Sequence, residues 1–198
     1  MRTSDVCRKT GETDIKLWLD LDGSGNSEID TGCGFLDHML TLFAKHSRID
    51  LRVRAVGDVN VDYHHTVEDV GICLGTAISA ALRGEDGMRG IHRYGDTILP
   101  MDEALILSAI DISGRAHLEY KVDIPSERVG DFDTELSEEF WRAFVRKAEV
   151  TLHVRQLSGT NSHHIIEGIF KSVARSFFEA KSLVSGFEND VPSTKGVI

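Results

Sequence analysis

The sequence predicts an α+β fold made of two similar halves, residues 1–90 and 91–198, that arose by internal duplication and form one compact unit. Three observations support this prediction. The five-residue pattern His-His-x-x-Glu occurs at residues 64–68 and again at 163–167. Each copy opens a long segment in which apolar residues recur at helical spacing. Each half also ends in the order helix, strand, helix, which indicates repetition of one structural unit.

The first half contains two predicted strands and two predicted helices. Residues 15–21 and 49–56 alternate between apolar and polar side chains, and an Asp-Gly or Gly-Asp pair follows each run. This pattern is typical of half-buried strands that end in turns. Residues 34–46 and 67–82 carry apolar side chains at helical spacing, which predicts helices with a buried face.

The second half follows a glycine-rich turn at residues 84–90 and again combines strands with helices. Its alternating runs are bounded by turn residues, and its last three elements repeat the order found in the first half. The predicted strands are residues 91–99, 104–112, 116–124 and 150–156, and the predicted helices are residues 135–148 and 164–183.

Composition excludes several classes of protein. The 198 residues are 41% hydrophobic and 27% charged, which is typical of a globular chain. A net charge of −10 argues against nucleic-acid binding, because an acidic surface repels a phosphate backbone, although a few local cations could still hold a small phosphorylated substrate. The cysteines Cys7, Cys33 and Cys73 form no Cys-x-x-Cys pair, so neither a disulfide framework nor a thiolate zinc site is predicted. Because no apolar run approaches a signal peptide or a membrane span, we expect a cytoplasmic protein without membrane contact.

The repeated His-His-x-x-Glu pattern predicts a divalent-metal site. Positions i and i+4 share one face of a helix, so His64 can meet Glu68 and His163 can meet Glu167. Adjacent histidines point about 100° apart, so each pair can serve two ions, or one ion in each of two subunits. Imidazole with carboxylate suits Mn²⁺, Fe²⁺, Co²⁺ or Zn²⁺. The alternative is a pair of polar helix N-termini, where the helix dipole favours glutamate in any case.

A further candidate ligand precedes each copy of the pattern. His38 lies in the predicted helix before the first copy, and Glu139 lies at a similar spacing before the second copy. If His38 is a ligand, Glu139 is its counterpart in the second half.

Cations near turns offer a place for an anion. Arg93 follows the glycine-rich turn, Arg115 follows Ser113-Gly114, and Lys171 lies one helical turn beyond Glu167. Three such cations could bind a phosphate through charge-assisted hydrogen bonds, although each taken singly could be an ordinary surface charge. The tail at residues 192–196, Pro-Ser-Thr-Lys-Gly, is either a frayed end or a segment that closes over the anion.

Taken together, these segments closely resemble the imidazoleglycerol-phosphate dehydratase family of histidine biosynthesis. The resemblance extends in order over nearly the whole chain. It is carried by TGCGFLDHML (31–40), DVNVDYHHTVED (58–69), GIHRYGD (90–96), MDEAL (101–105), DISGRAHL (111–118), TLHVRQLSGTNSHHIIEGIFK (151–171) and PSTKG (192–196).

The resemblance implies that each half has a four-stranded sheet with two helices on one face. It also implies a homo-oligomer of about 24 subunits, with two Mn²⁺ ions in each active site at subunit contacts. Carried over by position, the metal ligands are His38, His64, His65, Glu68, Glu139, His163, His164 and Glu167. At Glu139 the family usually has a histidine. A carboxylate can still bind Mn²⁺, so the site could persist with altered affinity. Alternatively, this position no longer binds metal, or the neighbouring Glu138 takes its place.

The resemblance further implies that the enzyme removes water from a phosphorylated imidazole substrate to give imidazole-acetol phosphate. The metal ions would act as Lewis acids and orient the substrate, and Glu12, in the segment 9–14, would be a general acid or base together with Glu167. The substrate contacts fall on Glu12, His38, Arg93, Asp102, Arg115, Lys171, Ser193 and Lys195. Two other interpretations use the same ligands, namely a metal-dependent hydrolase and a non-enzymatic oligomer organised by metal ions.

Overall fold

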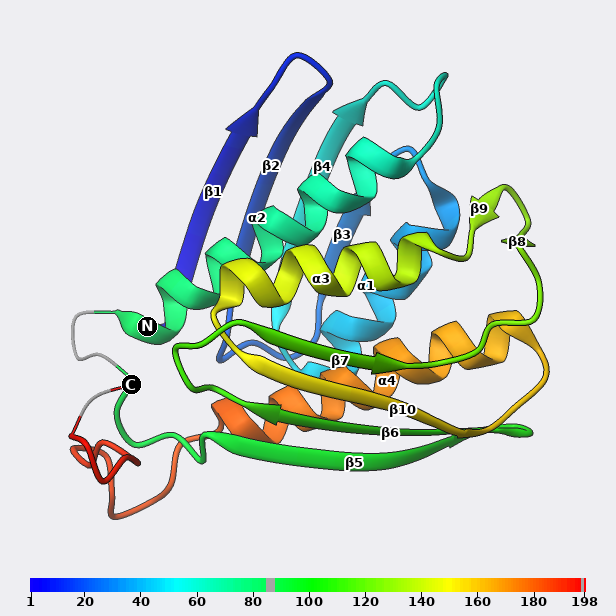
Figure 1. Ribbon diagram of the computed structural model, residues 1–198. Coiled ribbons are helices and arrows are strands. Elements are labelled where there is room, and N and C mark those ends of the chain that lie inside the picture. Colours follow the sequence, from blue (N-terminus) through cyan, green and yellow to red (C-terminus); the bar gives the residue numbers. More distant parts are fainter. Residues whose placement is uncertain (85–87, 197) are drawn as a thin grey trace.

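The first half of the chain folds into one sheet and two helices. The computed structural model describes residues 1–84, 88–196 and 198. The strands lie in the order β1-β2-β4-β3, in which β3 runs parallel to β4 and the other neighbours are antiparallel (Figure 1). The elements are β1 (Thr3–Lys9), β2 (Thr13–Asp20), β3 (Ser27–Asp30), α1 (Gly34–Ser47), β4 (Asp50–Gly57) and α2 (His64–Arg83).

The second half repeats this arrangement. Its sheet has the order β5-β6-β10-β7, and again only the last pair is parallel. A small hairpin, β8 with β9, is added before the third helix. The elements are β5 (Tyr94–Met101), β6 (Ala104–Asp111), β7 (His117–Lys121), β8 (Arg128–Val129), β9 (Phe132–Asp133), α3 (Leu136–Ala148), β10 (Thr151–Ser158) and α4 (Ser162–Lys181). The predicted α+β fold of two similar halves, each with a four-stranded sheet and two helices, is therefore confirmed.

Each predicted strand and helix is present, with bounds that differ by a few residues, but the sequence did not predict β1, β3, β8 or β9. The strands β1 and β3 form the two edges of the first sheet, and their residues alternate between exposed and half-buried positions. Such edge strands lack the fully buried apolar residues on which a periodicity argument depends. The glycine-rich turn at 84–90 lies partly outside the described residues.

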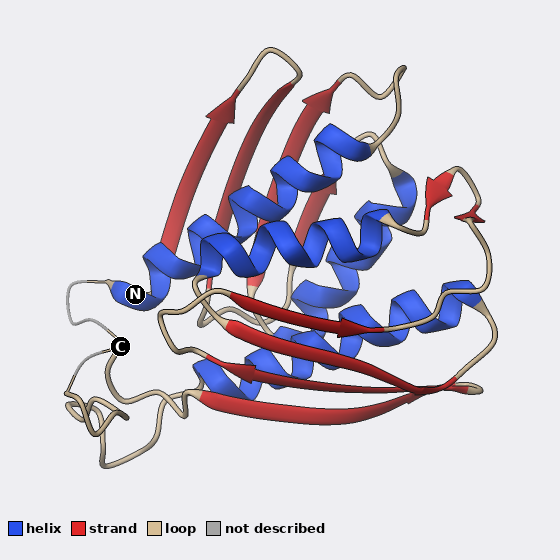
Figure 2. Cartoon of the chain, in the orientation of Figure 1, coloured by secondary structure: helices blue, strands red, loops and turns tan. Residues whose placement is uncertain are grey.

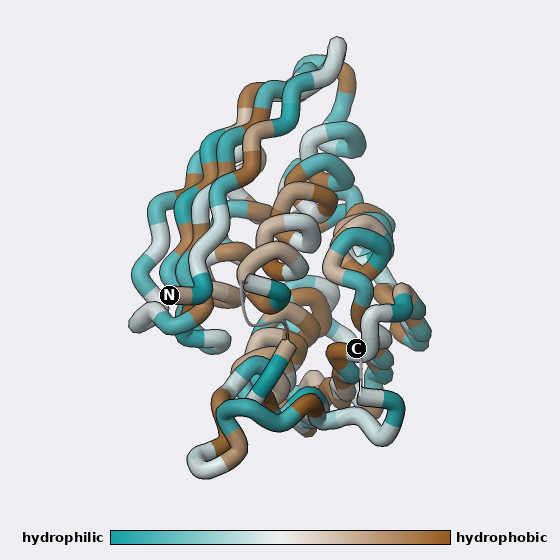
Figure 3. Tube along the Cα trace, turned by 90° about the vertical axis from the view of Figure 1, so that its left-hand side faces the viewer, coloured by the Kyte–Doolittle hydropathy of each residue, from teal (hydrophilic) through white to brown (hydrophobic). Residues whose placement is uncertain are grey.

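The helices lie between the two sheets (Figure 2). In β2 the side chains of Ile15, Leu17 and Leu19 face the helices and are at most 1% exposed, whereas Lys16 points outward and is exposed. Figure 3 shows the same alternation of hydrophobic and hydrophilic residues along the strands of the first sheet. Because one face of each sheet is apolar, both sheets bury that face against helices. No helix in the described part of the chain is long and apolar enough to cross a membrane.

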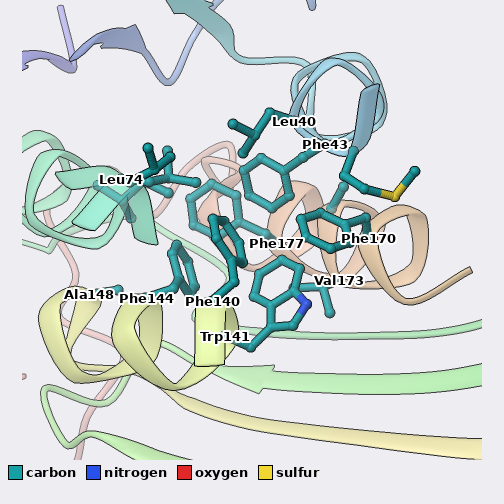
Figure 4. Close-up of a cluster of buried hydrophobic side chains, with 14 of the residues drawn as sticks. Leu40, Phe43, Leu74, Phe140, Trp141, Phe144, Ala148, Phe170, Val173 and Phe177 are labelled. Carbon is teal, nitrogen blue, oxygen red and sulfur yellow. The ribbon is translucent and has the colours of Figure 1, made fainter. Parts of the chain in front are cut away.

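The core is richest in aromatic residues where the helices of the two halves meet (Figure 4). Phe43 of α1 lies 6.0 Å from Trp141 of α3 and 6.1 Å from Phe177 of α4, measured between ring centroids. Helix α2 approaches α3 closely, since a Cβ atom at Gly71 would lie 2.7 Å from the carbonyl oxygen of Phe140. The halves therefore share one core, and this packing determines which side chains of different helices can meet.

Candidate metal centre

Packing of α1 against α4 brings three potential metal ligands together. His38 comes from α1, whereas His163 and Glu167 occupy positions i and i+4 at the start of α4. The Glu167 Oε2 atom lies 3.1 Å from His163 Nε2 and 3.5 Å from His38 Nε2. One ligand atom from each of the three residues lies within 4.8 Å of the others. Two imidazoles and a carboxylate converging in this way fit a divalent ion such as Mn²⁺.

Glu167 is the most buried member of this group. It is only 7% exposed, and Lys171, one helical turn further along α4, lies 2.5 Å from its Oε1 atom. Burial alone would raise the pKa of Glu167, but the hydrogen bond from Lys171, together with bonds from His163 and His38, lowers the pKa below its usual value. The carboxylate is therefore held in its ionised form, which is the form that binds metal.

Aromatic contacts orient the His163 ring. This ring and Phe35 of α1 form an edge-to-face contact, with ring centroids 5.3 Å apart and planes at 85°. Phe132, in the β8–β9 hairpin, in turn packs 4.9 Å from Phe35. The β8–β9 hairpin, which is present only in the second half of the described chain, therefore supports the predicted metal ligand His163 through Phe35.

The second histidine of α4 faces a different set of groups. Neighbouring side chains leave a helix in directions about 100° apart. The ring planes of His163 and His164 differ by 80°. His164 Nδ1 lies 2.7 Å from Glu103 Oε2, and its Nε2 atom lies 3.6 Å from Asp102 Oδ2. The hydrogen bond with Glu103 raises the pKa of His164 and lowers that of Glu103.

The first half presents its own cluster at the start of α2. His65 Nδ1 lies 3.0 Å from Asp58 Oδ2, and His65 Nε2 lies 3.7 Å from Glu12 Oε1. Glu68, however, is bound by Arg146 of α3 at 3.0 Å rather than meeting His64. The chain therefore brings Glu12 to the His64-His65 pair, but it directs Glu68 toward α3.

Glu139 lies on α3, the same helix as Arg146, which binds Glu68. Its nearest cation is Arg142, with Nε at 3.7 Å from Oε1. Arg142 also binds Glu138 at 2.5 Å. Within one chain, Glu68 and Glu139 are thus associated with arginines, while their counterparts Glu167 and His38 are associated with each other.

The predicted anion-binding residues Arg93, Arg115, Ser193 and Lys195 belong to another part of the fold. The Arg93 guanidinium binds Asp111 at 2.8 Å and donates to the carbonyl of Pro192 at 2.7 Å, so the tail lies against it. The loop that carries Arg115 begins beside Arg93, since Ile112 N donates to Arg93 O at 3.0 Å. Lys171 is not part of this group but binds Glu167.

The metal and anion groups lie at opposite ends of α4. Arg93 N donates to the carbonyl of Ala180, near the C-terminal end of this helix, at 2.8 Å. His163 lies at its N-terminal end. At a rise of 1.5 Å per residue the two ends are roughly 25 Å apart. One substrate cannot bridge these groups within a single chain.

Reasoning from the sequence missed Asp58 and Glu103, which contact ring nitrogens of His65 and His164, and Phe35, which packs on His163. Their only signal was their position inside the segments 58–69, 101–105 and 31–40 that carry the family resemblance. Nothing in their spacing from the histidines indicates contact, because a strand end brings Asp58 there, a turn brings Glu103, and the packing of α1 against α4 brings Phe35.

Comparison with known proteins gives one consistent result. Residues 31–177 match the family model described as imidazoleglycerol-phosphate dehydratase. A protein of that name from Rhodopseudomonas palustris (strain TIE-1) is 54% identical over 99% of this chain and 98% of its own length. Another, from Desulforamulus reducens, is 54% identical over 96% of this chain and 95% of its own length.

Solved structures agree with these relatives. The crystal structure of imidazoleglycerol-phosphate dehydratase from Staphylococcus aureus matches with a TM-score of 0.83 at 38% identity, covering 92% of this chain and 99% of that one. The structure of IGPD from Pyrococcus furiosus also matches with a TM-score of 0.83, at 37% identity over 98% of this chain and 100% of that one. The chain therefore belongs to the imidazoleglycerol-phosphate dehydratase family.

Proposed function

We propose that this protein is a hydro-lyase of histidine biosynthesis that converts D-erythro-imidazole-glycerol phosphate into imidazole-acetol phosphate and water. The observation that carries the proposal is the convergence of His38, His163 and Glu167 in a chain that belongs to this dehydratase family. A cytoplasmic location stays a prediction.

The donor set supports a site with two Mn²⁺ ions. His38, His163 and Glu167 would contribute to one ion, because their ligand atoms already lie within 4.8 Å of one another. His64, His65, Glu68, Glu139 and His164 would complete the coordination of both ions. When bound, Mn²⁺ supplies Lewis-acid polarisation and a template for the substrate.

The remaining side chains account for binding and proton transfer. Arg93, Arg115, Ser193 and Lys195 hold the phosphate, and Lys171, Asp102 and His38 contact the substrate. The Glu12 carboxylate removes a proton from the carbon chain while the C–OH bond of the neighbouring carbon breaks. Glu12 then passes that proton to the departing hydroxide, which leaves as water, and the resulting enol becomes the ketone. Glu167 is a second catalytic carboxylate, held ionised by Lys171.

The separation of roughly 25 Å along α4 supports active sites that are shared between copies of the chain. His163 of one copy would lie close to Arg93 and Arg115 of another. A closed homo-oligomer, for which the family resemblance suggests 24 subunits, would build every active site in this way.

Metal analysis combined with an assay of imidazole-acetol phosphate formation tests the proposed activity. Release of inorganic phosphate instead of the ketone would indicate a metal-dependent hydrolase. Bound metal without turnover would indicate a structural oligomer. Either result would overturn the proposal.

Mixing of inactive variants tests whether the sites are shared. Glu167→Gln and Arg115→Ala subunits, unfolded and refolded together, should regain part of the activity, because some sites combine an intact metal group with intact cations. The matched control mixes Arg93→Ala with Arg115→Ala, whose defects lie in one group, and it should stay inactive. Equal activities of the two mixtures would contradict a shared site.

A further inference from the structure

Two carboxylates contact the same ring atom in the two halves of the molecule. Asp58 Oδ2 lies 3.0 Å from His65 Nδ1, and Glu103 Oε2 lies 2.7 Å from His164 Nδ1. His65 and His164 are each the second histidine of a His-His-x-x-Glu pattern. We propose that Asp58 and Glu103 are positioning residues that orient these two imidazoles and leave each Nε2 atom free to bind metal. The inference rests on the proposed function.

The chemistry of imidazole explains why Nδ1 matters. A neutral ring has one nitrogen that donates a hydrogen and one that accepts. A carboxylate beside Nδ1 keeps the hydrogen on that nitrogen, so the lone pair is on Nε2, where a metal ion can use it. The carboxylate also limits rotation of the ring and makes it more basic.

The two carboxylates do not come from equivalent places in the repeat. Glu103 immediately precedes β6 in the β5–β6 turn, and the residue at that position in the first half is Glu12, immediately before β2. Glu12, however, lies on the Nε2 side of His65, at 3.7 Å. Asp58, which follows β4, contacts Nδ1 instead. The two carboxylates thus contact the same nitrogen, Nδ1, although they occupy different positions in the two halves. This indicates that each histidine needs a carboxylate at Nδ1, and that the contact is not simply inherited from one repeated unit.

This difference between the halves leaves Glu12 available for chemistry. In the second half the turn glutamate is committed to Nδ1 of His164, whereas in the first half Asp58 takes over that contact. Glu12, the turn glutamate of the first half, can then face the Nε2 side of His65, where metal and substrate would bind. Asp58 thus fits a site in which Glu12 transfers a proton.

Other contacts fix the Glu103 carboxylate and the backbone of Asp58. Glu103 Oε1 accepts hydrogen bonds from the backbone N–H groups of Asn161 at 2.8 Å and Thr160 at 3.2 Å, just before α4. Asp58 is tied to the β1–β2 turn, because its own N–H donates to the carbonyl of Glu12 at 3.1 Å. The Glu103 carboxylate therefore presents one oxygen to His164 from a fixed position, and the backbone of Asp58 is fixed beside His65.

Titration of the intact protein with Mn²⁺, followed by electron paramagnetic resonance of the free ion, tests the inference. Glu103→Gln and Asp58→Asn should each weaken Mn²⁺ binding about 10- to 100-fold, the usual effect of losing a carboxylate behind a metal-bound histidine. Glu103→Asp, which keeps the charge, should recover part of the affinity. The matched control is Asp62→Asn, because Asp62 accepts from the backbone of His64 at 2.8 Å without touching an imidazole ring, and it should keep the Mn²⁺ affinity.

The outcomes separate this inference from the proposed function. A wild-type protein that neither binds Mn²⁺ nor dehydrates the substrate would refute the proposed function. A wild-type protein that does both, with unchanged Mn²⁺ affinity in Glu103→Gln and Asp58→Asn, would refute the positioning role alone. If Asp58→Asn does not fold, the more exposed Glu103→Gln decides the question by itself, since its circular dichroism melting curve should match that of the wild type.

Discussion

His38 and Glu139 occupy equivalent positions in the two halves of the molecule. The helices α1 and α3 end at Arg48 and Glu149, which both have a left-handed backbone conformation. His38 precedes Arg48 by the same number of residues as Glu139 precedes Glu149. His38 contacts the Glu167 carboxylate, while Glu139 lies beside Arg142. The two similar halves therefore place a possible ligand at both positions, but with different chemistry.

This equivalence predicts that Glu139 binds metal. Glu139→Ala should weaken Mn²⁺ binding about tenfold or more, which corresponds to at least ~1.4 kcal/mol, whereas Glu139→His should retain binding because histidine is also a Mn²⁺ ligand. Isothermal titration calorimetry measures both. Glu138→Ala is the matched control, and wild-type affinity in Glu139→Ala would show that this position is not a ligand.

Glu12→Gln should keep metal and substrate binding but lose about 10²- to 10⁴-fold in kcat, because the amide can neither donate nor accept the transferred proton as a carboxyl group does. Steady-state kinetics and a Mn²⁺ titration together measure this. Asp14→Asn alters a carboxylate near the same turn that is paired with Lys9, and it should leave kcat unchanged. Unchanged turnover in Glu12→Gln would remove Glu12 from the mechanism.

Removal of metal should dissociate the assembly. If the ligands of each ion come from different copies, Mn²⁺ at 100 times its dissociation constant contributes about 2.7 kcal/mol per site to the assembled state. Native mass spectrometry after treatment with a chelator should show smaller species, and added Mn²⁺ should restore the large one. An assembly that persists without metal would contradict the prediction that the ions hold the copies together.

Gly75→Ala should destabilise the fold. A Cβ atom at this position would collide with the carbonyl oxygen of Phe144 and lie 2.9 Å from Ala148 N, at the closest approach of α2 and α3. Overpacking of this kind costs about 1–3 kcal/mol, or a fall of roughly 2–12 °C in Tm. Gly11→Ala, where nothing lies within 4 Å, is the matched control in thermal melts. Equal Tm values for the two variants would contradict the close packing.

Lys181 should make stability depend on pH in the alkaline range. Its side chain is buried and donates to the carbonyl of Leu21 at 2.6 Å, and burial, with the nearby Arg2, lowers its pKa to about 8. The unfolded chain keeps this proton up to a pKa near 10.5, so it binds more protons than the folded protein between these values. The contribution of Lys181 to stability therefore rises with pH from about 8 to 10.5.

Lys181→Met, which cannot titrate, isolates this effect. Denaturant unfolding at several pH values should show the stability of the wild type improving relative to Lys181→Met as pH rises from 8 to 10. A constant difference between the two proteins would show that Lys181 keeps an ordinary pKa.

Local patterns in the sequence determined much of this protein. The spacing of apolar residues predicted all four helices and the central strands, because helical and strand periodicities are properties of neighbouring residues. The meeting of His163 with Glu167, and the divergence of His163 from His164, follow from helix geometry in the same way. The repeated pattern also predicted the two similar halves.

Only the tertiary structure decided which groups from different elements meet. It brought His38 to Glu167 across α1 and α4, and it paired Glu68 with Arg146 rather than with His64. It also placed Glu103 on His164 and separated Arg93 from His163 by the length of α4. These relationships depend on how the helices of the two halves pack around a shared core. That packing is set by the combined shapes of many side chains far apart in the chain, so no local spacing encodes it.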